Sequence, residues 1–406
     1  MSQYLGTLLL IFIGFSFVAC GGPTNHGSDG DSGPGDGDGL GDLLDSDGDG
    51  DGDGDGDGDG DGDEPRFGFD VLFTEPGPSG PDESLGDLII DFLERAPESA
   101  KVRGAFYSFS REDVANAFVA AHQRGVDVHL VIGNSNQTYS GGDWSAVAIL
   151  RDGLEGKLSI CREGQSTGGC IGPNIHHNKF LIFSEVGPLE QHVVIQSSGN
   201  ITNFQTTQYD NAVTIYGDKT LYDGFLGYWE DLRRAQLNPN YNGEVQGELP
   251  VRAYFSPYAK GDPVLDELLE VDCSQGGEVY LAMAFFTNYR VDIADRLRAM
   301  STQGCDVGVL LRWSEIDSPG TRIGNALVRN TIDVGYFPES EANQLHSKYL
   351  IFRIEGEEGV VWTGSHNYTR SALFENDEVL LRIEDDRVFE EFRSNWNFMR
   401  ARAETR

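Results

Sequence analysis

The sequence predicts an α/β fold that is built twice within one chain of 406 residues. Apolar residues alternate as in strands and then recur with the 3.6-residue period of helices, and the connections are short. The same succession occurs in residues 66–245 and in residues 246–406. A short motif is also repeated, as HHNKFLIF at 176–183 and LHSKYLIF at 345–352. We therefore expect two tandem α/β/α sandwich units related by pseudo-twofold symmetry, with one active site at their interface.

Each half begins with an alternating strand that ends at a proline, FDVLFTEP at 69–76 and VRAYFSP at 251–257. A helix, a strand, a second helix and a second strand follow in both halves. The expected helices cover 85–96 and 112–125, then 263–271 and 291–304, and the expected strands cover 101–109 and 126–133, then 277–286 and 305–312. A glycine, Gly125 or Gly304, ends the second helix. This order predicts a largely parallel sheet with helices on its faces.

The first 65 residues differ from the rest. Residues 8–18 form an apolar run that is followed by Ala19 and Cys20, which predicts a lipoprotein-type signal over residues 1–20 with Cys20 as the lipid-carrying residue. The alternative is an ordinary cleaved signal peptide and a secreted protein. Residues 21–65 are rich in Asp and Gly and cannot bury a core, so we expect a disordered tether. The expected location is the cell envelope, anchored by lipid to a bacterial membrane.

The cysteine count agrees with export. Without Cys20 the chain has four cysteines, an even number that is consistent with disulfides in an oxidising compartment. Three pairings exist, and four unpaired thiols are the alternative. Because each half holds two cysteines, we favour Cys161–Cys170 and Cys273–Cys305.

The charge distribution argues against non-specific binding of nucleic acid. All 30 Lys and Arg residues lie in residues 66–406, together with 50 of the 66 acidic residues. Proteins that bind nucleic acid non-specifically normally have a basic surface, because the phosphates that they neutralise release counterions. A local basic groove is still compatible with this composition.

The repeated motif carries the chemistry. Residues two apart on a strand share a face, so His177 projects with Lys179 and His346 with Lys348. A further strand in each half precedes a Ser and an Asn, in SSGN at 197–200 and GSHN at 364–367. Ammonium groups and amides suit a phosphate, and two imidazoles suit nucleophile and general-acid roles. No Cys/His cluster has metal-ligand spacing, so we expect phosphoryl transfer without a metal or other cofactor.

This pattern resembles the phospholipase D superfamily, whose signature is H-x-K-x4-D followed by G-S-x-N, and the resemblance covers residues 66–406. It implies that His177 is the nucleophile that forms a phosphohistidine and that His346 is the general acid and base. It also implies that Lys179, Lys348, Asn200 and Asn367 hold the phosphate and that Ser198 and Ser365 are the motif serines. The motif Asp is replaced by Ser184 and Arg353, which indicates a structural role for that position.

The family also uses an acidic residue after the G-S-x-N motif to orient the histidine. Glu378 lies 11 residues after Asn367, whereas the same spacing after Asn200 reaches Asn211, with Asp210 beside it. We therefore expect His346 to face a carboxylate and to be the resting acid, and His177 to lie beside an amide and stay neutral. Of the remaining histidines, His176 is expected to be packed or on the surface, and His366 is an alternative site residue.

Three functions are compatible with these observations. The first is a phosphodiesterase that hydrolyses or transfers the phosphatidyl group of phospholipids, which the acidic folded part and the predicted envelope location favour. The second is a nuclease of the same superfamily. The third, an inactive binding lipoprotein, is disfavoured because all eight core motif residues are present. We expect a monomer, because both motifs are in one chain.

Overall fold

The computed structural model describes residues 64–136, 143–163, 165, 168–312, 322–327, 332–338 and 342–405. The predicted signal at 1–20, the lipidation site Cys20 and nearly all of the predicted tether at 21–65 lie outside these residues. The stretch from Asp59 to Arg406 is one compact unit that contains both halves of the repeat.

The first half forms a seven-stranded sheet of order β1-β8-β6-β5-β2-β3-β4. Its strands are β1 (Gly68–Phe73), β2 (Lys101–Phe106), β3 (Asp127–Ile132), β4 (Leu158–Ile160), β5 (Lys179–Gly187), β6 (Glu190–Ser197) and β8 (Asn211–Tyr216). Its helices are α1 (Ser84–Arg95), α2 (Glu112–Gln123), α3 (Ser145–Gly153) and α4 (Lys219–Arg234).

The second half forms a nine-stranded sheet of order β18-β13-β12-β11-β15-β16-β17-β10-β9. Its strands are β9 (Gly243–Gln246), β10 (Val251–Ser256), β11 (Gly277–Met283), β12 (Asp306–Arg312), β13 (Asp333–Phe337), β15 (Lys348–Ile354), β16 (Val360–Gly364), β17 (Glu378–Glu384) and β18 (Glu404–Thr405). Its helices are α5 (Pro263–Glu270), α6 (Val291–Gln303), α7 (Arg322–Leu327), α8 (Arg370–Phe374) and α9 (Asp386–Arg400).

The expected duplication is confirmed, because the central seven strands of the two sheets follow each other in the same order. The expectation of a largely parallel sheet is wrong. Within the two large sheets, as far as the structure describes them, only β2-β3-β4 and β11-β12-β13 pair in parallel, and the remaining pairs are antiparallel. The physical reason is that the motif strand in each half turns back directly into the next strand, β5 into β6 and β15 into β16.

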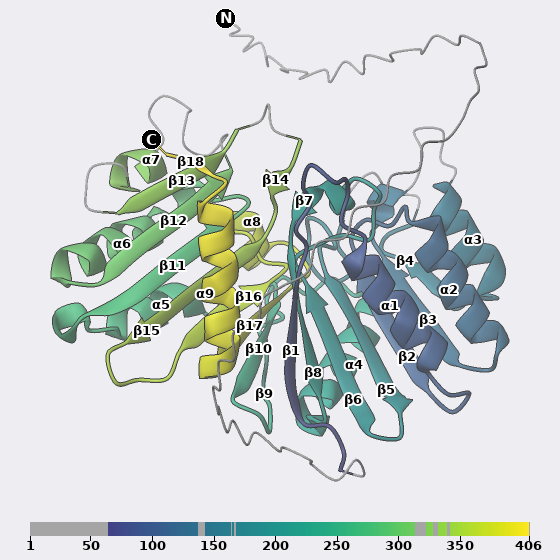
Figure 1. Cartoon of the computed structure of the whole chain (residues 1–406). Coiled ribbons are helices and arrows are strands. Elements are labelled where there is room, and N and C mark those ends of the chain that lie inside the picture. The colour runs from purple at the N-terminus through teal and green to yellow at the C-terminus, as the bar shows by residue number, and fades with distance from the viewer. Residues whose placement is uncertain are drawn as a thin grey trace, which may run out of the picture. The chain divides into compact units, whose positions relative to one another are not determined.

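The apolar side chains form three cores. One core lies between α1–α3 and the first sheet, a second lies between α5–α7 and the second sheet, and the largest lies between the two sheets. The helices α4 and α9 belong to this central core, and each packs against strands of both halves (Figure 1). Both begin at an aspartate whose side chain accepts a backbone N–H, Asp218 for α4 and Asp385 for α9. The burial of their apolar faces between the sheets therefore joins the halves.

Candidate active site

The two halves are also joined by strand pairing directly before each motif lysine. The short strands β7 (Gln208–Tyr209) and β14 (Gln344–Leu345) pair in parallel, and His176 forms an isolated bridge with Asp377. Both motif lysines are the first residues of their strands, β5 and β15, so each motif histidine lies at the junction between the halves.

Each motif histidine is hydrogen-bonded to a carboxylate of the opposite half. The Nδ1 atom of His177 lies 2.8 Å from Oε2 of Glu378, and the Nδ1 atom of His346 lies 2.8 Å from Oδ1 of Asp210. The predicted pairing of Glu378 with His346, and of an amide with His177, is therefore wrong. The cause is the strand pairing: the His177 backbone N–H donates to the Asp377 carbonyl, and that of His346 donates to the Tyr209 carbonyl. The next residue in each case supplies the carboxylate.

Asn211 does not contact either histidine. Its side chain donates to Oγ1 of Thr363 at 2.7 Å. Its backbone carbonyl accepts from the Ser198 N–H, as the Val379 carbonyl accepts from the Ser365 N–H. Asn211 therefore occupies the sheet position of Val379, and the equivalent of Glu378 is Asp210, which lies one residue closer to its motif. The expected difference between an amide and a carboxylate partner does not exist.

Burial controls the protonation of the two histidines. Desolvation lowers the pKa of His177 to about 4, although the Glu378 carboxylate opposes this shift. Desolvation and the Lys348 ammonium lower the pKa of His346 to about 4, against the Asp210 carboxylate. Despite burial, the pKa values of Asp210 and Glu378 are lowered, because each lies beside a histidine and a lysine. An ionised carboxylate at Nδ1 fixes the proton there, which leaves Nε2 of a neutral ring with its lone pair.

The motif lysines are buried beside the histidines. Lys179 and Lys348 are each 1% exposed, and the Nζ atom of each donates to the backbone carbonyl of the histidine two residues before it. Desolvation lowers the pKa of Lys179 to about 7 and that of Lys348 to about 8, while the carboxylates of both halves oppose it. Two closely placed ammonium groups in a buried site are well suited to bind a phosphate anion.

The motif serines support the carboxylates. Ser198 Oγ donates to Oδ1 of Asp210 at 2.6 Å, and Ser365 Oγ donates to Oε2 of Glu378 at 2.6 Å. Each serine therefore fixes the oxygen that its half presents to the histidine of the other half.

The motif asparagines, Asn200 and Asn367, each have a buried Oδ1 atom that has no hydrogen-bond partner among the described residues. Two buried amides, Gln205 and Asn376, also contact the carboxylates and were not predicted from the sequence. Gln205 lies in a loop whose sequence is not repeated in the other half, so no pattern pointed to it. For Asn376 the only indication in the sequence is weak: an amide residue two positions before Glu378.

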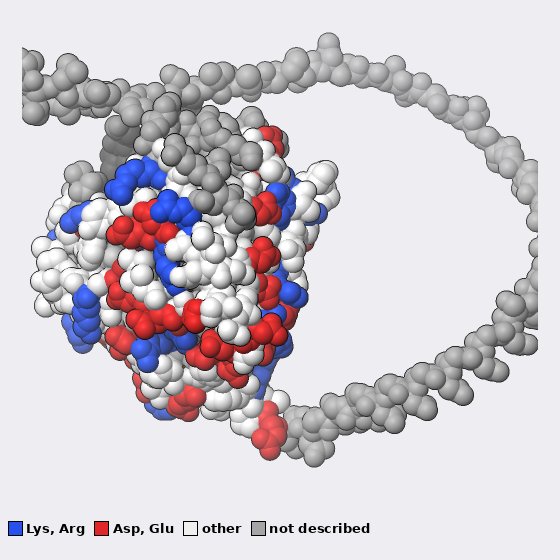
Figure 2. Space-filling view, turned by 90° about the vertical axis from the view of Figure 1, so that its left-hand side faces the viewer, with Lys and Arg blue, Asp and Glu red and all other residues white. Residues whose placement is uncertain are grey.

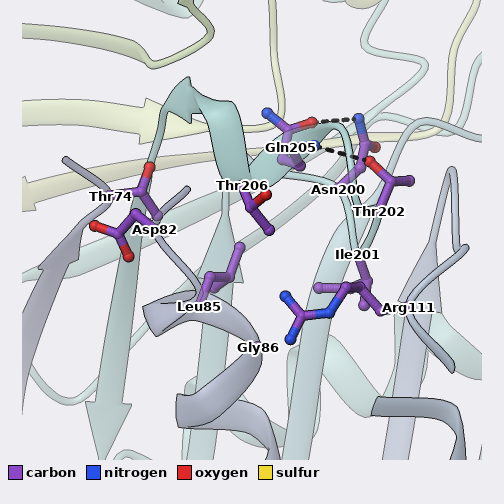
Figure 3. Close-up of a pocket in the computed structure, with 10 residues that line it drawn as sticks. All are labelled: Thr74, Asp82, Leu85, Gly86, Arg111, Asn200, Ile201, Thr202, Gln205 and Thr206. Atoms are coloured by element: carbon purple, nitrogen blue, oxygen red, sulfur yellow. Dashed lines mark hydrogen bonds between the residues drawn. The ribbon is translucent and has the colours of Figure 1, made fainter. Parts of the chain in front are cut away.

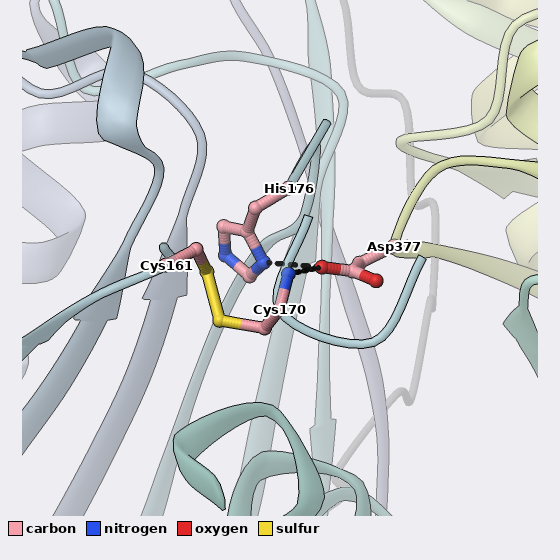
Figure 4. Close-up of side chains that lie close together, drawn as sticks. All are labelled: Cys161, Cys170, His176 and Asp377. Carbon is pink, nitrogen blue, oxygen red and sulfur yellow. Dashed lines mark hydrogen bonds and ion pairs between the residues drawn. A yellow bond between two sulfur atoms is a disulfide. The ribbon is translucent and has the colours of Figure 1, made fainter. Parts of the chain in front are cut away.

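The predicted disulfides Cys161–Cys170 and Cys273–Cys305 are both present. The first lies beside His176 and Asp377 in a cluster whose ligand-type atoms are within 4.8 Å of one another (Figure 4). Both sulfurs are used in the disulfide, and the Asp377 carboxylate accepts the backbone N–H groups of residues 170–172. The cluster therefore acts as a structural clamp between the halves. His176 is packed inside the cluster, with its Nδ1 atom 3.3 Å from Oδ2 of Asp377. Of the two positions expected for this residue, packed or on the surface, the structure shows the packed one.

His366 is buried and faces a different cluster. Its Nδ1 atom accepts from Nη1 of Arg290 at 3.3 Å, and Arg290 forms an ion pair with Asp262. Burial and the Arg290 charge lower the pKa of His366 to about 4. The structure places His366 beside Arg290 at the start of α6, and among the described residues no hydrogen bond joins it to a motif histidine.

A cavity of about 390 Å³ opens onto His346. Four aromatic side chains line it: Tyr107, Trp144, Phe204 and Phe285. Phe204 is 64% exposed at its rim. The residues that line a second, smaller cavity of about 20 Å³ include Asn200, Gln205, Leu85 and Arg111 (Figure 3). The larger cavity gives a bulky substrate access to the histidine.

Comparisons with known proteins agree with this geometry. A family model described as "Cardiolipin synthase, PLD-like domain" matches residues 89–230 and 273–399, one segment in each half. No curated protein sequence matches the chain.

Two solved structures share the fold. Phosphatidylserine synthase from Haemophilus influenzae Rd KW20 has a TM-score of 0.59 and 13% identity, over 83% of this chain and 87% of that chain. Polyphosphate kinase from Porphyromonas gingivalis has a TM-score of 0.53 and 14% identity, over 80% of this chain and 49% of that chain. This chain therefore spans about half the length of the kinase. At these identities the two likenesses show the fold alone.

Proposed function

The chain belongs to the phospholipase D superfamily, and on this premise we propose that it is a phosphodiesterase that acts on phospholipids through a phosphohistidine on His177. The observation that carries this proposal is the pair of matched histidine–carboxylate contacts, His177 with Glu378 and His346 with Asp210, beside two buried lysines. The lysines supply the positive charge that stabilises negative charge on the phosphoryl oxygens.

The reaction proceeds in two displacements. In the first, Nε2 of His177 attacks phosphorus as the ester P–O bond breaks, and His346 gives an Nε2 proton to the leaving oxygen. Because the pKa of His346 is about 4, the imidazolium that gives this proton is a minor species of the free protein near neutral pH. In the second, neutral His346 takes a proton from water or an alcohol, whose oxygen attacks phosphorus as the P–N bond to His177 breaks. The family motif order assigns His177 the nucleophilic role, since both histidines have a carboxylate partner.

Two features favour a lipid substrate over a nucleic acid. The aromatic cavity beside His346 suits an amphiphilic ester, although aromatic rings also stack on bases. Acidic side chains gather in a broad band across one face of the molecule, with basic side chains dispersed among them (Figure 2). The folded part is also acidic overall, which opposes association with a polyanion. A nuclease remains the second candidate because it would use the same histidines and lysines.

We also propose that the protein is exported and anchored through a lipid on Cys20. The apolar run before Cys20 and the two disulfides support this proposal. Among the helices of the described residues, none is long and apolar enough to cross a bilayer.

The test is a parallel assay of purified protein with phosphatidylcholine vesicles, bis(p-nitrophenyl) phosphate and plasmid DNA, all in EDTA. The proposal predicts turnover of the vesicles and of the aryl diester, with intact plasmid. A His177→Ala preparation, purified identically, controls for contaminating enzymes. Plasmid cleavage without lipid turnover would establish the nuclease instead, and loss of all activity that one metal restores would refute the metal-independent mechanism.

A further inference from the structure

Each catalytic carboxylate is held by an amide side chain at its second oxygen. The Nε2 atom of Gln205 donates to Oδ2 of Asp210, and the Nδ2 atom of Asn376 donates to Oε1 of Glu378 at 2.9 Å. Both amides are 5% exposed. Each histidine partner is therefore fixed from two sides, by a serine at one oxygen and an amide at the other.

The hydrogen bonds of Gln205 can be accounted for one by one. Its Nε2 has two hydrogens, and they go to Oε1 of Gln208 at 2.7 Å and to Oδ2 of Asp210. The same nitrogen lies 3.0 Å from Nδ1 of His346. Nδ1 of His346 donates its hydrogen to Asp210 and cannot accept one from Gln205 at the same time. The short distance between Nδ1 and Nε2 of Gln205 is therefore a packing contact and not a hydrogen bond. A ring flip would place a carbon where Nδ1 now meets Asp210, so the carboxylate that Gln205 holds favours the present orientation of the ring.

Gln205 also reaches the predicted phosphate-holding asparagine. Its Oε1 atom accepts from Nδ2 of Asn200 at 3.1 Å. One amide thus contacts Asn200, Asp210 and His346 and lines the cavity that opens onto His346.

Asn376 makes no equivalent connection within the described residues. Its Oδ1 atom accepts from Nδ2 of Asn174 across the junction of the halves at 2.8 Å, and no hydrogen bond joins it to Asn367. The link between a motif asparagine and a catalytic carboxylate is therefore found only on the His346 side of this part of the chain.

We propose that Gln205 is a positioning residue for His346: it fixes the Asp210 carboxylate against the ring and couples both to Asn200 at the phosphate. This inference rests on the proposed function. Loss of Gln205 then impairs the proton transfers of His346 and spares the attack by His177, whereas loss of Asn376 impairs the attack.

The direction of the effect on His346 follows from charge. Without the Gln205 hydrogen bond the Asp210 carboxylate keeps more of its charge for the ring, which stabilises the imidazolium form. The pKa of His346 therefore rises in Gln205→Met, a substitution that keeps the length of the side chain and removes its amide. Thr207→Val is the matched control, because Thr207 lies in the same turn and, within the described part of the chain, its hydroxyl is hydrogen-bonded to the Phe204 carbonyl alone.

The experiment combines kinetics with nuclear magnetic resonance of selectively ¹⁵N-histidine-labelled protein. With bis(p-nitrophenyl) phosphate, Gln205→Met should keep a p-nitrophenol burst within about threefold of wild type, because this leaving group needs no proton. Its steady-state rate should fall by on the order of 10-fold to 100-fold. Asn376→Leu should slow the burst itself. Long-range ¹H–¹⁵N spectra should show a shifted tautomer or titration for His346 in Gln205→Met and not in Thr207→Val.

The spectra distinguish the positioning role of Gln205 from the proposed phosphodiesterase function. If wild type turns over no diester but Gln205→Met alters the His346 resonances, the positioning role stands and the proposed function fails. If wild type is active and Gln205→Met leaves both the steady-state rate and the His346 resonances unchanged, the positioning role is wrong. A burst that is lost together with the steady-state rate, with unchanged His346 resonances, also contradicts it.

Discussion

His177 is hydrogen-bonded to Glu378, a residue 201 positions away in the other half of the chain. The reciprocal contact joins His346 to Asp210. Each half thus supplies the histidine of one pair and the carboxylate of the other, so neither half contains a complete histidine–carboxylate pair. The duplicated fold has one site because the halves exchange these groups across their junction.

The exchange predicts that both carboxylates are needed. Glu378→Gln and Asp210→Asn should each reduce kcat by on the order of 10²-fold to 10⁴-fold, because an amide can hold the wrong imidazole tautomer. Asn211→Ala, which removes a side chain that donates a hydrogen bond to Thr363 and none to a histidine, should remain within about threefold of wild type. The measurement is kcat for each variant on the aryl diester. A large loss in Glu378→Gln and Asn211→Ala with normal Asp210→Asn activity would restore the arrangement first expected from the sequence.

The titration of the two motif lysines should set the decrease of kcat/KM at alkaline pH. Burial lowers the pKa of Lys179 to about 7 and that of Lys348 to about 8, so each ammonium group loses its proton as the pH rises through that value. The positive charge at the phosphate is then lost, and kcat/KM for bis(p-nitrophenyl) phosphate should fall between about pH 7 and pH 8. His177 should be neutral, and therefore nucleophilic, from about pH 4 upward.

The check is a profile of kcat/KM from pH 4 to pH 9.5. Lys179→Arg is the matched variant, because a guanidinium group keeps its charge over this range. Its residual activity should fall only at the higher pH set by Lys348. A wild-type profile that stays level or rises up to pH 9 would exclude charged lysines as the phosphate-binding groups.

The disulfides should separate stability from activity. Cys273–Cys305 spans 32 residues and Cys161–Cys170 spans 9, so the chain-entropy model predicts that removing the longer loop's disulfide costs about 1 kcal/mol more. The shorter loop, however, holds Asp377 next to Glu378. The Cys161→Ala/Cys170→Ala variant should therefore lose more kcat but less unfolding free energy. Urea unfolding measures the free energy of unfolding, and steady-state kinetics measure kcat. If the variant that loses more stability also loses more kcat, the proposed role of the Cys161–Cys170 loop as a structural clamp is wrong.

The repeat could be predicted from the sequence because its signals are local. The apolar periodicity gave the element order, the two H-x-K motifs identified the histidines and lysines, and the number of cysteines in each half indicated the disulfides. These features depend on residues that are close together in the chain or alike in the two halves.

The partners of the histidines could not be predicted in this way. Which carboxylate reaches His177 depends on the pairing of residues 175–177 with 377, a contact between distant segments that no local pattern specifies. The spacing of 11 residues matched Glu378 but missed Asp210, because the loop that contains Gln205 is one residue shorter. Gln205 itself acts through side-chain hydrogen bonds from an irregular turn, for which the sequence has no periodic signal.

The central claim is that the two histidines have successive roles, with the phosphoryl group on His177. The most direct measurement is rapid quenching of His346→Ala protein with bis(p-nitrophenyl) phosphate, followed by mapping of the acid-labile adduct by mass spectrometry. The account predicts about one p-nitrophenol released per molecule and an adduct on His177, because the first leaving group departs without a proton and the second step lacks its base. An adduct on His346 in the wild-type protein, with none on His177, would contradict it.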